Sequence, residues 1–185
     1  MNSHVIVSAL DTTDWFYKKA ETAGIRLSEN KIQHLLFLAQ IHFALKEGRH
    51  LMPSLFVCGR SGFYEPTIRT LLKFGLPLMN KTELTPAANR FLDLIWQKYA
   101  LKEDKTLDAF IWSLECWKHF YRPEEETIVD PLDCVDSFAG ALQKNPAEQT
   151  EKSKILISQN GPVKVSAWHP RKLDISKNKE KKQNA

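Results

Sequence analysis

Three cysteines and six histidines are the side chains of this sequence best suited to metal or covalent chemistry. Cys116 and His119 lie three residues apart, on one face of an expected helix, and Cys134 follows further along the chain. A structural zinc site normally uses two closely spaced ligand pairs, and the second pair is missing. We therefore expect small buried cysteines, a histidine at the helix surface and no metal site.

A second possible chemistry is nucleophilic catalysis by Cys58. It would require a neighbouring base and a group that stabilises an oxyanion. His50 lies eight residues before Cys58, and Arg60 two residues after it. The stretch GRSGF at 59–63 has two glycines and an arginine but lacks the spacing of a nucleotide-binding motif, so it favours a turn. We expect no catalytic residues and no cofactor, and we keep an enzyme around Cys58, His50 and Arg60 as a third hypothesis.

Aromatic residues are more informative, because five tryptophans and ten phenylalanines occur in only 185 residues. Most of them recur at helical spacing and are expected in the core. Trp112 instead lies beside the inner stripe that its helix presents, and surface tryptophans are enriched in interface hot spots. Trp112 is therefore expected to contact either a partner or the C-terminal hairpin. The partner-binding surface is expected around Trp112 and the 51–66 loop, with Arg60, Phe63 and Tyr64 as its other residues.

The elements that must position these residues are mainly helices. Apolar periodicity and start and stop signals predict a compact bundle of about six, with N-caps or first-turn prolines at Ser28, Pro66, Thr85-Pro86 and Asp130-Pro131. The expected helices cover 11–23, 28–48, 66–74, a stretch from 86 to about 99, a stretch from 104 or 106 to 120, and 131–142. Residues 51–61 are expected to be irregular. Together these elements make a helical domain over 1–145.

The character of the sequence changes after Pro146. The stretch ILISQNGPVKV within 146–170 is typical of a small β-hairpin, and 171–185 have the composition of a disordered tail. This tail carries six basic and two acidic residues, which account for the whole formal net charge of +4. The rest of the chain is neutral, which excludes a folded domain that holds nucleic acid by its overall field.

The sequence also predicts the cellular location of the protein. Even the richest apolar stretch, 35–45, is interrupted by Gln40 and His42, so no membrane span is expected. The amino-terminal residues lack the basic region of a signal peptide. We expect a cytoplasmic protein without a membrane partner, whose oligomeric state the sequence leaves open.

The stretch KIQHLLFLAQIH at 31–42 resembles the hallmark helix of the Panacea antitoxin domain, also called the SocA-like, phage-associated domain. The matching hallmark positions are Lys31, Gln33, Leu36, Ala39 and Gln40. A leading helix, a Gly-x-x-Leu element at 48–51 and a Trp-x-x-Tyr stretch at 96–99 extend the resemblance over roughly residues 8–122. The Gly-Pro dipeptide of the family's turn is absent from 57–66.

This resemblance implies a helical bacterial or phage-encoded protein without enzymatic activity. Such a protein binds a toxin and neutralises it, or acts as an adaptor that delivers the toxin to a protease. Our leading hypothesis is therefore a protein-interaction domain of this type, with a cognate toxin or protease as its partner. The alternative is a nucleic-acid-associated regulator that combines a helical core with the basic tail at 171–185.

Overall fold

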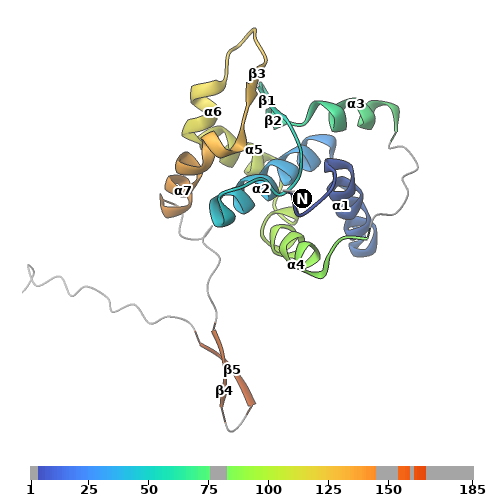
Figure 1. Cartoon of the computed structure of the whole chain (residues 1–185), viewed down its shortest axis with the longest axis vertical. Helices are drawn as coiled ribbons and strands as arrows, with labels where there is room; N and C mark the ends of the chain where they lie inside the picture. Colours follow the sequence, from blue (N-terminus) through green and yellow to red (C-terminus); the bar gives the residue numbers. More distant parts are fainter. Residues whose placement is uncertain (1–3, 76–82, 145–153, 159–160, 166–185) are drawn as a thin grey trace, which may run out of the picture. The chain divides into compact units, whose positions relative to one another are not determined.

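The computed structural model describes residues 4–75, 83–144, 154–158 and 161–165. The chain forms two separate compact units, which divide after Gln149. The first unit is mainly helical, as the sequence predicts (Figure 1). Among the described residues, no helix has the length and apolar character required to cross a membrane.

The helices of the first unit follow one another along the chain with few strands between them. The α-helices are α1 (Ala9–Ala23), α2 (Glu29–Glu47), α3 (Pro66–Phe74), α4 (Pro86–Ile95), α5 (Asp104–Ser113), α6 (Glu115–Phe120) and α7 (Val135–Lys144). The π-helix η1 (Trp96–Ala100) continues α4, and the 3₁₀ helix η2 (Pro131–Cys134) leads into α7. The strands are β1 (Phe56–Gly59), β2 (Gly62–Tyr64) and β3 (Thr127–Val129).

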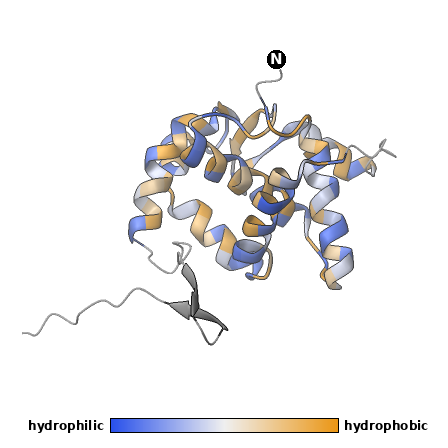
Figure 2. Ribbon diagram, turned by 60° about the horizontal axis from the view of Figure 1, so that its bottom comes forward, coloured by the Kyte–Doolittle hydropathy of each residue, from blue (hydrophilic) through white to orange (hydrophobic). Residues whose placement is uncertain are grey.

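Helix α2 is the central element of this unit. It contacts α1, α3, α4, α5 and α7 as well as η1, η2 and β2, and Figure 1 shows it in the middle of these helices. The Ser28 hydroxyl accepts a hydrogen bond from the Lys31 N–H and begins the helix, and Gly48 ends it with a φ of 66°. Most other helices alternate hydrophobic and hydrophilic residues, as expected for helices that bury one side (Figure 2).

Most of the expected helix starts are confirmed. The Thr85 hydroxyl accepts a hydrogen bond from the Ala88 N–H ahead of Pro86, and the Asp130 carboxylate accepts one from the Leu132 N–H ahead of Pro131. Each proline occupies the first turn, where its missing N–H costs no hydrogen bond. The composition of these short motifs therefore determines where α4 and η2 begin.

The expected single helix from about 104 to 120 is wrong, because the chain breaks at Leu114. This residue is extended, with a ψ of 130°, and its side chain is fully buried. The backbone N–H of Cys116 donates to Ser137 Oγ on α7, at 2.9 Å. A cap supplied by another helix therefore starts α6, and such a contact cannot be recognised from the local sequence.

Residues 51–61 are also not simply irregular, because β1 lies within this stretch. It forms the middle of an antiparallel sheet in the order β2-β1-β3. Phe56 pairs with Val129 and Cys58 with Phe63, and the side chains of all four are buried. Because β3 joins from about seventy residues further along the chain, a local sequence window contains no signal for this pairing.

The second unit contains the expected hairpin, formed by β4 (Lys154–Ser158) and β5 (Gly161–Val165). Ser158 pairs with Gly161 and Ile157 with Pro162. The expected disordered tail at 171–185 lies outside the described residues, and so do the rest of the 146–170 extension and its turn.

The π-helix η1 places Tyr99 against α2. His42 Nε2 lies 2.8 Å from the Tyr99 hydroxyl, and the two rings are 5.5 Å apart. Burial, with a smaller contribution from Lys98, lowers the pKa of His42 to about 3. The neutral imidazole is therefore the form that the folded protein accommodates.

This low pKa predicts a loss of stability in mild acid. In the unfolded chain histidine has a pKa near 6.5. Below that pH the unfolded state therefore binds a proton at His42 and the folded state does not, which favours unfolding. Between pH 7 and pH 5 we expect His42 to remove about 2 kcal/mol from the free energy of unfolding, measured by urea titration. His42→Gln should flatten this dependence by that amount. Equal pH dependence in both proteins would contradict the assignment.

A candidate partner-binding pocket beside helix α2

The polar residues of α2 hold the segments that follow this helix in the chain. Gln40 is fully buried, and its amide pairs with the backbone of Met52 in both directions. The Met52 N–H donates to Gln40 Oε1, and Gln40 Nε2 donates to the Met52 carbonyl, each at 3.3 Å. Gln40 Nε2 also lies 2.8 Å from His50 Nδ1. Gln40 thus pairs with both backbone groups of one residue, as a residue of a neighbouring antiparallel strand would.

The amino-terminal half of α2 holds α5 and the β1–β2 turn. The Lys31 ammonium lies 3.0 Å from the Asp104 carboxylate, while its stem is buried. His34 Nε2 lies 3.1 Å from the carbonyl oxygen of Ser61, and its Nδ1 lies 3.5 Å from Asp108. Burial lowers the pKa of His34 despite these neighbours. Gln40, Lys31 and His34 are polar residues that the apolar pattern of the helix does not require. Each of them contacts a neighbouring segment of the chain.

Gln33 uses only one end of its amide within the described residues, as His34 uses only one ring nitrogen for a hydrogen bond. Its Oε1 accepts a hydrogen bond from the Glu65 N–H at 2.7 Å. This contact fixes the orientation of the amide, so that Nε2 is the group directed away from Glu65. Nε2 is buried and has no hydrogen-bond partner in the described part of the chain. A buried donor without an acceptor is rare and costly.

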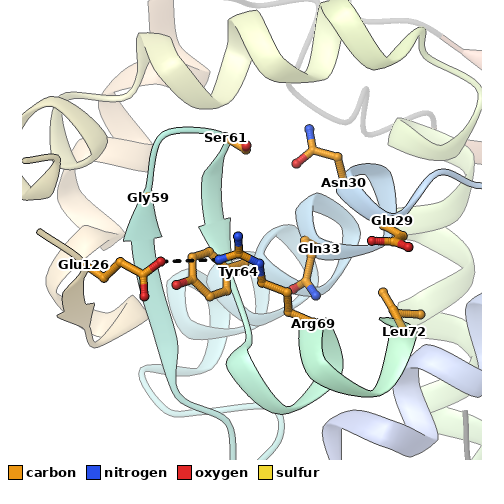
Figure 3. Close-up of a pocket in the computed structure, with 9 residues that line it drawn as sticks. All are labelled: Glu29, Asn30, Gln33, Gly59, Ser61, Tyr64, Arg69, Leu72 and Glu126. Carbon is orange, nitrogen blue, oxygen red and sulfur yellow. Dashed lines mark hydrogen bonds and ion pairs between the residues drawn. The ribbon is translucent and has the colours of Figure 1, made fainter. Parts of the chain in front are cut away.

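Gln33 lines a pocket of about 280 Å³ (Figure 3). The other lining residues come from the start of α2, the β1–β2 turn, β2, α3 and the loop before β3, and they are Glu29, Asn30, Gly59, Ser61, Tyr64, Arg69, Leu72 and Glu126. Figure 3 shows the amide end of Gln33 turned toward the helix that carries Arg69 and Leu72. Ligand pockets usually have volumes of roughly 300–1,000 Å³, so this one suits a group of one or two residues.

Arg69 is the cation of this pocket. Its guanidinium lies over the ring of Tyr64, 4.3 Å from the centroid, and 3.4 Å from the Glu126 carboxylate. Burial, together with Glu126, raises the pKa of Tyr64 to about 12, so the phenol stays neutral. Glu65 caps α3 by accepting from the Ile68 N–H, and its own N–H is held by Gln33. Gln33 therefore helps to set the position of the helix that carries Arg69.

An aromatic row borders the same region. Trp117 stacks on Tyr121 with the centroids 4.7 Å apart, and Trp112 lies 6.3 Å from Trp117. The indole N–H of Trp117 donates to the carbonyl of Gly59, which also lines the pocket. Trp112 has 42% of its surface exposed, which agrees with its expected position beside the inner stripe of α5.

The structure brings some of the expected partner-binding residues together and separates others. Tyr64 lines the pocket, and the exposed Arg60 lies between the lining residues Gly59 and Ser61. The placement of Phe63 on this surface is wrong, because its ring is buried and stacks on Phe37 with the centroids 4.1 Å apart. The alternation of a β-strand, absent from the expected irregular loop, explains this difference.

The hallmark positions belong chiefly to the interior. Leu36 and Ala39 are fully buried in the core, whereas Lys31, Gln33 and Gln40 hold neighbouring segments through the contacts described above. Gln33 is the hallmark residue that also lines the pocket. Arg69, Glu126 and Asn30 line the pocket but were not predicted from the sequence. The sequence signal that pointed to this site was Gln33, a glutamine in an otherwise apolar stretch of helix.

No protein-family model matches this chain, and neither a curated protein nor a solved structure is significantly similar to it. The pocket and the aromatic row are therefore interpreted from their own geometry.

Cys58 is a free, buried residue of the core. Burial raises the pKa of the Cys58 thiol to about 12, and its Sγ lies 3.9 Å from the carbonyl of Trp117. His50 instead contacts Gln40 and Asp130. Cys58 is therefore a thiol at neutral pH.

Cys116 and Cys134 are also buried thiols. Their mutual hydrogen bond raises the pKa of Cys134 and lowers the pKa of Cys116. In the ranges 4–75 and 83–144, no three side chains of histidine, cysteine, aspartate or glutamate gather in a way that could hold a metal ion.

Proposed function

We propose that this chain is a protein-binding domain that neutralises a toxic partner in the manner of the Panacea-type antitoxins, by covering the partner directly or by delivering it to a protease. The observation that carries this proposal is the pocket beside α2. There a buried amide donor, with no acceptor among the residues that the structure describes, lines the same pocket as an arginine that stacks on an aromatic ring. These groups are arranged to receive a polar group from outside the chain.

The surroundings of the pocket support a protein as the partner. The half-exposed Trp112 and the stacked pair of Trp117 and Tyr121 supply an aromatic surface close to Gly59 at the edge of the pocket. Aromatic anchors next to a pocket with a few oriented polar groups are typical of protein interfaces. The described part of the chain is proposed to act by binding in the cytoplasm, not by catalysis.

Co-expression tests this proposal. The products of the genes adjacent to the gene for this chain are expressed one at a time in a bacterial host, with and without this chain, and viable colonies are counted. We expect one product to reduce viability and the chain to restore it. Viability that is unaffected by every adjacent product, or that this chain fails to restore, would contradict the proposal.

The alternative function, a nucleic-acid-associated regulator, rests on the basic residues of 171–185. Six cations that contact phosphates would give a dependence of log K on log salt with a slope of about −5. We expect any binding of nucleic acid to be confined to the tail at 171–185. Deletion of 171–185 should abolish binding to a DNA duplex in fluorescence anisotropy and leave neutralisation unchanged. Loss of neutralisation on deletion would favour a function centred on the tail.

A further inference from the structure

We infer that the pocket beside α2 takes a carboxylate of the partner protein, with the Arg69 guanidinium and the Gln33 amide N–H as its donors. This inference rests on the proposed function and deepens it by naming the chemical group that the pocket recognises. The carboxylate belongs to an aspartate or glutamate side chain or to the carboxyl terminus of the partner.

Gln33 offers the pocket a buried hydrogen-bond donor. Its oxygen is committed to the Glu65 N–H at 2.7 Å, which leaves the NH₂ group as the free end of a side chain that is only 5% exposed. Nε2 finds no acceptor among the described residues, although Gln33 is part of the pocket wall. An oxygen of a bound ligand would satisfy this donor and remove the cost of leaving it unpaired. A ligand group that can only donate would not.

Arg69 offers the pocket a cation that is already oriented. The Tyr64 ring beneath the guanidinium restricts its motion, so that less freedom is lost when it binds an oxyanion. Its present carboxylate contact is Glu126, at 3.4 Å, and that side chain is 66% exposed. Exposed pairs of this kind contribute little to stability. Glu126 thus occupies the place of a ligand carboxylate, and a partner can displace it.

The other charges and the walls of the pocket also favour a carboxylate. Glu29 and Glu126 are exposed, so water and salt screen their repulsion of an incoming carboxylate. A cationic ligand would be attracted by these two residues, but it would meet Arg69 and the NH₂ group of Gln33 inside. The side chain of Leu72 and the ring of Tyr64 form apolar walls beside the donors. A carboxylate attached to a short apolar or peptide stem therefore fits this pocket best.

Titration of the full chain with small probes tests the inference, with the ¹⁵N-labelled side-chain amide of Gln33 and the Arg69 Nε–H observed by NMR. N-acetyl-leucine carries a terminal carboxylate, N-acetyl-glutamate α-amide carries a side-chain carboxylate, and N-acetyl-leucinamide carries neither. We expect a carboxylate probe to shift both resonances in a saturable way and the amide probe not to. The carboxylate that binds more tightly identifies the source. N-acetyl-lysinamide tests the cationic alternative, and stronger binding of it would overturn the inference.

Two variants and a control sharpen the test. Glu126→Gln, which removes the competing carboxylate, should strengthen binding of the carboxylate probe severalfold. Arg69→Gln should weaken it roughly tenfold or more, as expected for a lost hydrogen bond to a charged group. Lys73→Gln, a loss of the same charge from an exposed position on α3, should change it little. Equal affinity in wild type and Arg69→Gln, or weaker binding to Glu126→Gln, would overturn the inference.

These outcomes separate the inference from the proposed function. Neutralisation by a chain whose pocket binds no carboxylate would refute the inference and leave the function standing. Saturable carboxylate binding by a chain that neutralises none of its neighbours' products would refute the function and leave the inference standing.

Discussion

Gln40→Leu is expected to lower the free energy of unfolding by about 4 kcal/mol, measured by urea or thermal denaturation at pH 7. Leucine has nearly the same size as glutamine, so the packing changes little, but its side chain cannot form hydrogen bonds with the backbone of Met52. The substitution leaves both the N–H and the carbonyl of the buried Met52 without their partner. Each buried backbone group left unpaired costs about 1–3 kcal/mol.

The effect should extend beyond α2, because the segment around Met52 also holds the amino terminus. The N–H groups of Val5 and Ile6 both donate to the carbonyl of Leu51, at 3.0 Å. Gln97→Leu provides the matched control, since Gln97 is exposed on η1. It should change stability by less than about 0.5 kcal/mol. If Gln40→Leu proved as stable as Gln97→Leu, Gln40 would not be the anchor of this segment.

Arg69→Gln is expected to abolish neutralisation of the toxic partner while the protein stays folded. The variant removes the cation of the pocket and its stacking on Tyr64, and the Arg69 side chain itself is about half exposed, at 48%. Exposed cation–π and ion-pair contacts contribute about 1 kcal/mol or less each, so the thermal transition should shift only slightly. The same colony assay used for the wild type measures the loss.

Lys73→Gln serves as the control on the same helix, because Lys73 is exposed and does not line the pocket. It should neutralise as well as the wild type. Arg69→Gln that is folded and fully active would exclude the pocket from the function. An inactive Lys73→Gln would show that the net charge of α3, and not a specific contact of Arg69, is responsible.

Most of the helical fold could be predicted from the sequence, because the signals that start α2, α4 and η2 are local. Ser28, Thr85-Pro86 and Asp130-Pro131 each act within one turn of their own helix. The break at Leu114 and the three-stranded sheet could not be predicted, because Ser137 and β3 act from distant parts of the chain.

The candidate site divides in the same way. Tyr64 and Gln33 were identified, one as a partner-binding residue and the other as a hallmark of α2. Arg69 and Glu126 were missed, because they are separated by more than fifty residues and become neighbours only when β3 pairs with β1. Phe63 was misplaced for a different reason, because the local β1–β2 hairpin was not expected and β2 directs the Phe63 ring toward Phe37.

The central claim is that the pocket beside α2 holds a carboxylate of the neutralised partner, and charge reversal tests it most directly. Arg69→Glu is combined with each Asp→Arg and Glu→Arg variant of the partner found by co-expression, and with a version of it that has an amidated carboxyl terminus, and binding is measured by calorimetry. Our account predicts that Arg69→Glu abolishes binding to the wild-type partner and that one partner variant restores it. Undiminished binding of Arg69→Glu, or a failure of every partner variant to restore binding, would contradict the account.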